Sequence, residues 1–404
     1  MNTLFNVLEE LSLQPSLFES EEKFSPDEVT KDYPVIVSEF WTAKQRQACS
    51  LHEIAYRACF KPQLPNFFIT KLTEKGEVVY DPFSGRGTTV IEAALCGRNA
   101  IANDINPISR VLSEGRIKIP TIQELKRRLE EIKTDGNSTS EIELSMFFHS
   151  ETLSEIIALK NYFLEKEDLD HVDKWVRMVA TNRLTGHSKG YFSVYTLPPN
   201  QAVTPDRQIK INEKYKQEPT YRSTKEIIYK KSLSLLKDLT SAQKRNLQNS
   251  KVQFLSNDAR NMPEIKAESV ALTITSPPFL DVVQYAKDNW LRCWFNGIDA
   301  KEIEKKITMA KTVEKWSEIM SDVFKELYRI TKKNGFVVFE VGEVKNGKVN
   351  LEDFVVPLGR NAGFICDCVM INKQNFTKTA NIWGVNNNDK GTNTNRIVVF
   401  KKYL

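Results

Sequence analysis

The chain has 404 residues, of which 41% are hydrophobic and 27% charged, as in ordinary soluble globular proteins, so a fibrous or wholly disordered chain is excluded. No apolar run approaches the ~18 residues that a membrane-spanning helix needs, and the N-terminus lacks the basic start and apolar stretch of a signal peptide. The six cysteines are scattered, without the spacing of zinc ligands or of a disulfide framework. We therefore expect a cytoplasmic protein without a metal and without a membrane partner.

The net charge of +5 is unevenly distributed along the chain. Residues 205–251 hold twelve Lys and Arg against five Asp and Glu, whereas residues 1–40 hold nine acidic residues against two lysines. A charge run usually marks a solvated face, but a concentrated positive segment also suits nucleic-acid phosphates. We predict an acidic N-terminal arm over residues 1–40 and keep both interpretations of the basic segment.

The first part of the chain, residues 41–110, contains a parallel βαβ unit. Residues 43–60 predict a helix, and a short second helix follows the two prolines of KPQLPNFFITKL. The apolar run at 77–83 predicts a buried strand, which leads through a Gly-rich turn into a helix that ends near residue 97. A second short strand at 100–104 completes the unit, and such units imply a doubly wound parallel sheet.

The next strands lie far downstream, at 252–259 and 270–279. The intervening residues 111–250 contain charged helical segments and then an irregular Pro-, Tyr- and Lys-rich region, which together predict an inserted lobe. Residues 251–404 continue with a long helix, a strand at 336–342 and two further strands, FICDCVMI and RIVVFKK. The predicted fold class is therefore α/β: a doubly wound, mostly parallel sheet with a largely helical inserted lobe.

A glycine-rich motif, DPFSGRGTT at residues 81–89, occupies the turn from strand to helix. Its glycines permit close approach of a ligand, and the helix N-terminus offers free N–H groups. The third glycine of a dinucleotide fingerprint is replaced by Val90, and the Gly-Lys-Ser/Thr of a nucleotide triphosphatase is missing. The motif therefore disfavours dinucleotide binding and nucleotide triphosphate hydrolysis, and a G-x-G pattern on its own can also be only a tight turn.

Three further positions continue this site. Asp104 closes the second strand, where an acidic side chain can accept both ribose hydroxyls, although it can also cap the following helix. Asp258 follows the third strand and is expected beside an adenine edge. In TSPPF, at residues 275–279, consecutive prolines must end a strand. The Ser276 hydroxyl, the Pro277 carbonyl and the Phe279 ring then form a receptacle for a planar base with an exocyclic amine.

Taken together, these motifs resemble the amino-methyltransferases of bacterial DNA, which transfer a methyl group from S-adenosylmethionine to an exocyclic amine. The resemblance covers residues 50–110 and 250–404, and it implies a Rossmann-like class I methyltransferase fold, S-adenosylmethionine as cofactor, double-stranded DNA as partner, and a cognate restriction enzyme as a further partner to consider. It implies catalytic roles for Ser276, Pro277, Pro278 and Phe279. It implies cofactor binding by Phe60, Pro62, Asp81, Phe83, Gly85, Gly87, Thr88, Asp104, Ile105, Asp258 and Ala259.

The inserted lobe departs from the family pattern, because in the commonest arrangement with this motif order the insertion follows the third strand. Its role is therefore inferred from charge and from irregular, Gly-containing sequence. The expectation is that it grips and reads DNA. The residues expected to bind DNA are Arg183, His187, Ser188, Lys189, Tyr191, Lys210 and Lys214. The alternative is a solvated helical lobe that only braces the fold.

The target base follows from the first catalytic position. In the resembling family, Ser at that position accompanies mostly cytosine N4, and Asp or Asn accompanies mostly adenine N6. We expect methylation of cytosine N4 in a base flipped out of the duplex, with adenine N6 as the alternative. Carbon-5 methylation is excluded because the chain has no Pro-Cys dipeptide for the nucleophile. An RNA methyltransferase acting on an exocyclic amine and a non-catalytic protein of the same fold remain as rival hypotheses.

Overall fold

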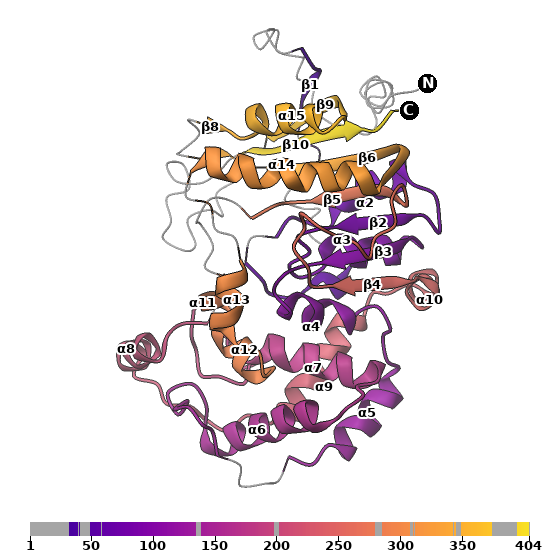
Figure 1. Ribbon diagram of the computed structural model, residues 1–404. Helices are drawn as coiled ribbons and strands as arrows, with labels where there is room; N and C mark the ends of the chain where they lie inside the picture. Colours follow the sequence, from indigo (N-terminus) through magenta and orange to yellow (C-terminus); the bar gives the residue numbers. More distant parts are fainter. Residues whose placement is uncertain are drawn as a thin grey trace.

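A computed structural model of the protein describes residues 32–38, 40, 49–57, 59–134, 139–197, 202–278, 285–307, 310, 312–341, 343–344, 349–373 and 394–403. These residues form a large sheet with helices on both faces, and a helical lobe lies beyond one edge of the sheet (Figure 1). The predicted fold class is therefore confirmed. Within the described ranges, no helix combines the length and the apolar character needed to cross a bilayer.

The sheet has eight strands. Their spatial order is β1 (Val35–Ser38), β9 (Ile365–Lys373), β10 (Thr394–Lys401), β6 (Thr331–Val341), β5 (Val270–Thr275), β2 (Val78–Asp81), β3 (Asn99–Asn103) and β4 (Val252–Leu255). Strand β10 runs antiparallel to both of its neighbours, and the other pairs of this sheet are parallel. A separate two-stranded sheet joins β7 (Glu343–Val344) to β8 (Val349–Asn350).

The order of the strands reverses between β2 and β5. The chain runs from β2 outward to β3 and β4, and it then returns to the other side of β2 to form β5 and β6. Open α/β sheets bind ligands at the carboxyl ends of the strands, beside such a reversal. The topology therefore places the ends of the two predicted motif strands, at Asp81 and Thr275, next to one another.

Helices cover both faces of the sheet, so its central strands are apolar on both sides (Figure 1). One face carries α2 (Gln63–Leu72) and α3 (Thr88–Leu95), and the other carries α14 (Val313–Ile330) and α15 (Glu352–Asn361). Phe324 of α14 lies between Phe339 and Phe400 of the sheet, with ring centroids 4.9 and 5.3 Å away. This packing fixes α14 against β6 and β10.

The inserted lobe lies between β3 and β4 in the chain, as predicted. Its helices are α4 (Ile108–Glu114), α5 (Ile122–Glu131), α6 (Ser150–Glu165), α7 (His171–Arg183), α8 (Pro205–Tyr215), α9 (Thr224–Leu236) and α10 (Ser241–Asn249). Its core is centred on Trp175 of α7, which is fully buried and donates its indole N–H to the Ser232 hydroxyl of α9 at 2.9 Å.

The region after residue 204 is helical, which corrects the prediction of an irregular segment there. Thr204, Ser223 and Thr240 each accept a hydrogen bond from a backbone N–H in the first turn of α8, α9 and α10. Such caps stabilise a helix N-terminus by about 1 kcal/mol each. They initiate helices within a sequence whose charge and prolines obscure the helical pattern.

Three short helices that follow β5 join the lobe rather than the sheet. These are α11 (Tyr285–Asp288), α12 (Trp290–Phe295) and α13 (Ala300–Lys306). Just after α12, the Asn296 side chain accepts a hydrogen bond from Arg177 at 2.7 Å and donates one to Thr181 at 3.0 Å, both on α7. The lobe is thus built from two stretches of chain, and the second lies within the predicted catalytic part.

The helix predicted over residues 43–60 does not form where the structure describes it. A single turn, η3 (Ser50–His52), is followed by a path without regular structure. Here the backbone carbonyls are bound by side chains from elsewhere: Arg86 donates to the carbonyls of His52 and Ile54, and Arg292 donates to that of Ala55. Residues 41–48 lie outside the described ranges. The predicted second helix is confirmed as α2, which begins directly after Pro62.

Candidate active site

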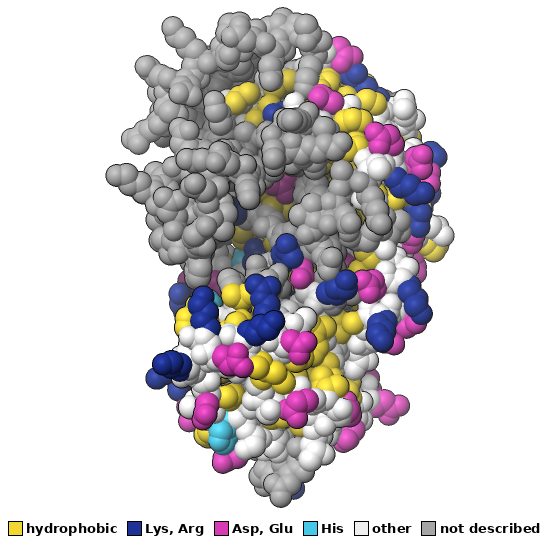
Figure 2. All heavy atoms as spheres, turned by 90° about the vertical axis from the view of Figure 1, so that its left-hand side faces the viewer, with side chains coloured by type: hydrophobic (Ala, Val, Ile, Leu, Met, Phe, Trp, Pro, Cys, Tyr) yellow, Lys and Arg dark blue, Asp and Glu magenta, His cyan; other side chains and the backbone are white. Residues whose placement is uncertain are grey.

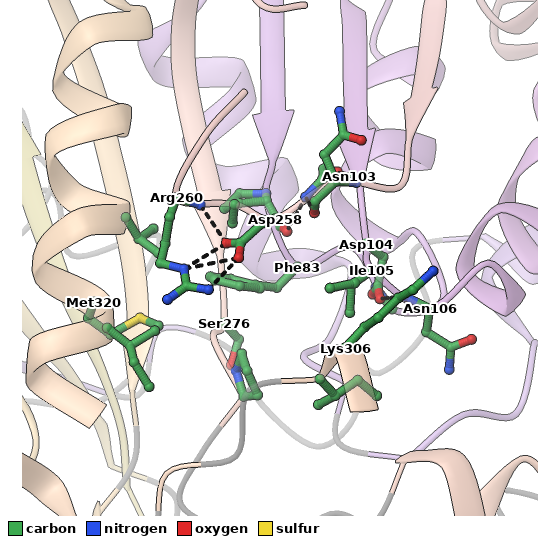
Figure 3. Close-up of a pocket in the computed structure, with 18 of the residues that line it drawn as sticks. Phe83, Asn103, Asp104, Ile105, Asn106, Asp258, Arg260, Ser276, Lys306 and Met320 are labelled. Carbon is green, nitrogen blue, oxygen red and sulfur yellow. Dashed lines mark hydrogen bonds and ion pairs between the residues drawn. The ribbon is translucent and has the colours of Figure 1, made fainter. Parts of the chain in front are cut away.

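A pocket opens at the carboxyl ends of β2, β3, β4 and β5, at the reversal of strand order (Figure 3). It encloses about 890 Å³ of empty space, part of it open to solvent. Ligand pockets at this position are typical of α/β enzymes. The walls consist of Tyr56, Pro82, Phe83, Gly85, Asn103, Asp104, Ile105, Asn106, Asn257, Asp258, Ala259, Arg260, Ser276, Pro278, Lys306, Ile307, Ile319, Met320 and Val323.

The glycine-rich turn after β2 forms one wall. Gly87 caps α3 at a φ of 78°, and a Cβ at this position would lie 2.3 Å from the Ser113 hydroxyl oxygen. Gly85 also has a positive φ, of 51°, and the Tyr56 ring lies 3.5 Å from where its Cβ would be. Both positions therefore need glycine, for conformation and, at Gly87, also for space. The turn presents backbone rather than side chains to the pocket at Gly85.

Asp104 lines the pocket directly after the last residue of β3 (Figure 3). Its carboxylate accepts hydrogen bonds from the backbone N–H of Gly85 at 2.8 Å and from that of Asn106 at 2.9 Å. Burial raises the pKa of this carboxyl to about 6, although the two hydrogen bonds act in the opposite direction and lower the pKa. Asp104 does not cap the next helix, because the N-cap of α4 is Pro107, with no side-chain bond. Each carboxylate oxygen retains capacity for a further donor.

Asp258 follows β4 and faces the same pocket (Figure 3). It accepts hydrogen bonds from Arg260, through the backbone N–H at 3.0 Å and through the guanidinium Nε at 2.9 Å. The Arg260 hydrogen bond lowers the pKa of Asp258, so this carboxylate is ionised near neutral pH. Sequence reasoning missed Arg260, although it lies only two residues from the predicted acid.

The Ser-Pro-Pro corner begins directly after β5, whose last residue is Thr275. The Thr275 hydroxyl donates to the Asp81 carboxylate at 2.7 Å, which joins the catalytic corner to the glycine-rich turn. Burial raises the pKa of Asp81 to about 7. From α14, the Trp316 indole N–H donates to the Pro278 carbonyl at 3.0 Å. Ser276 and Pro278 line the pocket, and Pro277 is buried beside them.

The pocket fits a nucleoside that carries a polar tail. The Asn106 side chain is 2% exposed and lines the pocket, yet its amide nitrogen has no hydrogen-bond partner among the described residues. A buried donor of this kind costs free energy until a ligand acceptor reaches it. Phe83 and Ile105 offer apolar walls for a base, and Asp104 offers acceptors for ribose hydroxyls. These groups match S-adenosylmethionine, whose amino-acid end carries a carboxylate.

The predicted cofactor residues fall into two groups. Those that line the pocket are Phe83, Gly85, Asp104, Ile105, Asp258 and Ala259. Those that do not line it are Phe60, Pro62, Asp81, Gly87 and Thr88. Asp81, Gly87 and Thr88 shape the glycine-rich turn, whereas Phe60 packs against the core between α2 and the sheet. Tyr56, from the same segment of the chain, lines the pocket. Phe279, predicted to stack on the base, lies outside the described residues.

Other lining residues were missed for different reasons. Asn106 belongs to an Asn-Pro pair directly after Asp104, so its sequence position was a usable signal. Lys306 and Met320 carry no local signal, because α13 and α14 reach the pocket only through the packing of the lobe and of the second helical layer.

Two of the residues predicted to bind DNA are buried. Arg183 and Tyr191 are each 7% exposed, and the Arg183 guanidinium lies 4.0 Å from the centre of the Tyr191 ring. Their stacking holds the loop after α7, which corrects the prediction that they donate to bases or phosphates. The other predicted residues are exposed: His187, Ser188 and Lys189 on that loop, and Lys210 and Lys214 on α8.

Comparisons with known proteins agree with the geometry of the pocket. A family model described as DNA methylase matches residues 14–110. The type II methyltransferase M.BsoBI of Geobacillus stearothermophilus is 24% identical over 351 residues, which cover 76% of this chain and 68% of that protein. The type II methyltransferase M.MjaII of Methanocaldococcus jannaschii is 35% identical over 74 residues, which cover 18% of this chain and 14% of that protein.

Among solved structures, an rRNA methyltransferase of Streptomyces viridochromogenes is similar over 90% of this chain and 96% of its own, at 10% identity and a TM-score of 0.36. A methyltransferase of Methanosarcina mazei is similar over 83% of this chain and 97% of its own, at 9% identity and a TM-score of 0.33. The family model and the type II relatives agree with the motifs that meet in the pocket, and together they support a relationship to the S-adenosylmethionine-dependent DNA amino-methyltransferases.

Proposed function

We propose that the protein methylates the exocyclic N4 of cytosine in double-stranded DNA, acting on a base flipped out of the duplex. The observation that carries the proposal is the position of Ser276: it lines the same pocket as Asp104, so a base held by Ser276 and a cofactor held by Asp104 would meet. Adenine N6 is the alternative target, because the residues that line the pocket do not discriminate between the two amines.

The chain contributes hydrogen-bond acceptors to the reaction. S-adenosylmethionine supplies the methyl group as an electrophile. A nucleobase amine is a poor nucleophile, because its lone pair is delocalised into the ring. The Ser276 hydroxyl and the Pro277 carbonyl would accept hydrogen bonds from this amine and favour a localised lone pair. Thr275 and Trp316 hold the corner in place through their bonds to Asp81 and Pro278, so the acceptors are preorganised.

We propose base flipping on the basis of where the pocket lies. Ser276 is at the end of a buried strand, and a base inside a duplex cannot reach it. Enzymes that act on a base therefore extrude it, and stacking on an aromatic ring offsets part of the cost. Phe279, three residues beyond Ser276, is proposed as that ring, and Ser in the first catalytic position favours cytosine as the base.

The first test is the identity of the methylated base. Duplex DNA incubated with the protein and isotope-labelled S-adenosylmethionine should yield labelled N4-methylcytosine after digestion and mass spectrometry. N6-methyladenine instead would overturn the base assignment and leave the site standing. Transfer RNA is the matched control substrate, since label in tRNA but not in DNA would favour the rival RNA methyltransferase.

We propose further that the lobe grips DNA through an exposed basic face. Lys210 and Lys214 lie four residues apart and are exposed on α8, and the exposed loop residues His187, Ser188 and Lys189 belong to the same lobe. Figure 2 views the molecule from the side on which α8 lies in Figure 1, and it shows Lys and Arg side chains gathered across the middle of that side. Such a surface suits the phosphates of a duplex whose flipped base enters the pocket.

The double charge reversal Lys210→Glu with Lys214→Glu should weaken duplex binding and reduce the slope of log affinity against log salt by about 2, because each phosphate contact contributes about 0.9. Binding of S-adenosylmethionine should not change. The matched control is Lys244→Glu with Arg245→Glu on α10, which belongs to the same basic segment but lies on the opposite side of the molecule (Figure 1). Equal losses in both double variants would mean that only net charge matters and that α8 is no specific contact.

A further inference from the structure

A buried glutamate lies directly beside the proposed catalytic serine. Glu340 is in β6, within an otherwise apolar strand, and it is 7% exposed. In the parallel pair of β5 and β6, Thr275 is in register with Phe339. The next residues along the two strands, Ser276 and Glu340, are therefore neighbours. On its other side Glu340 is in register with Ile397 of β10, which offers no polar group from its side chain.

The two side chains interact. Burial raises the pKa of Glu340 to about 7, and the hydrogen bond between the Ser276 side chain and this carboxyl opposes the rise because it favours the ionised form. This hydrogen bond therefore joins Ser276, which lines the pocket, to Glu340, which does not line the pocket. Glu340 has no part in the chemistry proposed above.

The other charged groups on neighbouring elements are engaged elsewhere. Arg396 of β10 is paired with Glu352 of α15. Asp81, at the end of β2 and beyond β5, accepts the Thr275 hydroxyl. On the helical layer that covers this face of the sheet, Glu92 of α3 is bound to His52. Within the part of the chain that the structure describes, Ser276 is a hydrogen-bond partner of Glu340.

The direction of the hydrogen bond determines what Ser276 can offer to a substrate. A hydroxyl has one hydrogen and two lone pairs. An ionised Glu340 can only accept, so Ser276 must donate to it and keeps its lone pairs for the pocket. A protonated Glu340 can donate to Ser276 instead, and the serine hydrogen is then free to turn toward the pocket. In that state Ser276 presents a donor to an amine that is itself a donor.

We propose that Glu340 is a positioning residue for Ser276: its carboxylate accepts the serine hydroxyl hydrogen and so aims the serine lone pairs at the exocyclic amine of the target base. This inference rests on the proposed function, since it assigns Glu340 a task in that reaction. The matching consequence is that methyl transfer requires Glu340 in its ionised form.

The test is the pH profile of single-turnover methyl transfer at saturating cofactor and DNA. In the wild-type protein the rate should fall about tenfold per pH unit below pH ~7, as Glu340 takes up a proton. Glu340→Gln should transfer methyl groups about 100-fold more slowly at pH 8, which is the effect of misplacing a reacting group by about 1 Å. Its pH profile should lack the fall in rate that protonation of Glu340 causes. Cofactor affinity measured by calorimetry should stay at the wild-type value.

The matched control is Glu352→Gln, which removes another fully buried carboxylate, on a helix that contributes nothing to the pocket. This variant should lose stability but keep the wild-type pH profile of transfer. A wild-type rate with an unchanged acid limb in Glu340→Gln would overturn the proposal. So would a loss of activity in Glu340→Gln that follows its loss of folded protein, as in the control.

A second measurement separates this inference from the proposed function. Free energies of unfolding for Ser276→Ala, Glu340→Gln and the double variant form a cycle, and the proposal expects the two single changes to be non-additive. Because the pKa of Glu340 is raised above its ordinary 4.5 in the folded state, the wild-type protein should lose stability as pH rises from about 5 to 7, and Glu340→Gln should lose less. Additive variants overturn the pairing whether or not DNA is methylated. A wild-type protein that transfers no methyl group to DNA, with a coupled cycle, overturns the proposed function alone.

Discussion

Ser276→Ala should lower the rate of methyl transfer by about 10²- to 10³-fold, the effect of removing one preorganised hydrogen-bonding group from a reacting centre. The change removes an acceptor at the end of β5 and its hydrogen bond to Glu340, whereas Thr275 still bonds to Asp81 and Trp316 still bonds to Pro278. Cofactor affinity should be retained, since Asp104 and its two backbone donors are unchanged. The measurement is single-turnover transfer of labelled methyl into duplex DNA, with calorimetry for the cofactor.

Ser269→Ala provides the control for this experiment. Ser269 precedes the first residue of β5, at the end of the strand opposite the pocket, and its hydroxyl donates to a nearby backbone carbonyl at 2.6 Å. The same substitution there should leave the transfer rate unchanged. A wild-type rate in Ser276→Ala would show that the Ser-Pro-Pro corner does not receive the reacting amine, and the site would have to be sought elsewhere along the pocket.

Asp104→Ala should weaken binding of S-adenosylmethionine by about 2–3 kcal/mol, or roughly 30- to 150-fold, the free energy of a charge-assisted pair of hydrogen bonds. The carboxylate also holds the Gly85 and Asn106 backbone N–H groups, so its removal leaves two donors unsatisfied beside the cofactor. Asp104→Asn keeps the shape and one acceptor, and it should cost less than Asp104→Ala. Unchanged affinity in a folded Asp104→Ala protein would remove this residue from the cofactor site.

The same carboxylate predicts how cofactor binding depends on pH. Burial raises the pKa of Asp104 to about 6, from an ordinary value of 3.8. A neutral carboxyl is a weaker acceptor for ribose hydroxyls, so affinity should be constant above pH ~7 and fall as pH drops through 6. Calorimetry between pH 5 and 8 measures this, and Asp104→Asn should show a flatter profile. An affinity that is level across this range in the wild-type protein would contradict the assignment.

Local sequence patterns were enough to predict the parts of the site that depend on neighbouring residues in the chain. Strand-forming apolar runs end at Asp81, Asn103 and Thr275, and each is followed by a turn whose glycines, acid or prolines force the backbone out of the sheet. Because the carboxyl ends of parallel strands meet at one edge, the motifs after these strands had to converge. The same local patterns placed the inserted lobe between β3 and β4.

The contributions of segments that are distant in the chain depend on how the protein folds. Residues 53–57 do not form a helix, because the Arg86 and Arg292 side chains donate hydrogen bonds to the backbone carbonyls of Ile54 and Ala55. Along this irregular path Tyr56 reaches the pocket. Arg183 and Tyr191 look like exposed polar residues in a glycine-containing stretch, yet they stack inside the lobe. Glu340 is visible in the sequence as a charge within an apolar strand, but nothing near it in the chain indicates its partner. Its hydrogen bond to Ser276 depends on the register between β5 and β6. Burial and register arise from contacts between elements far apart in the chain, so no pattern of adjacent residues could reveal them.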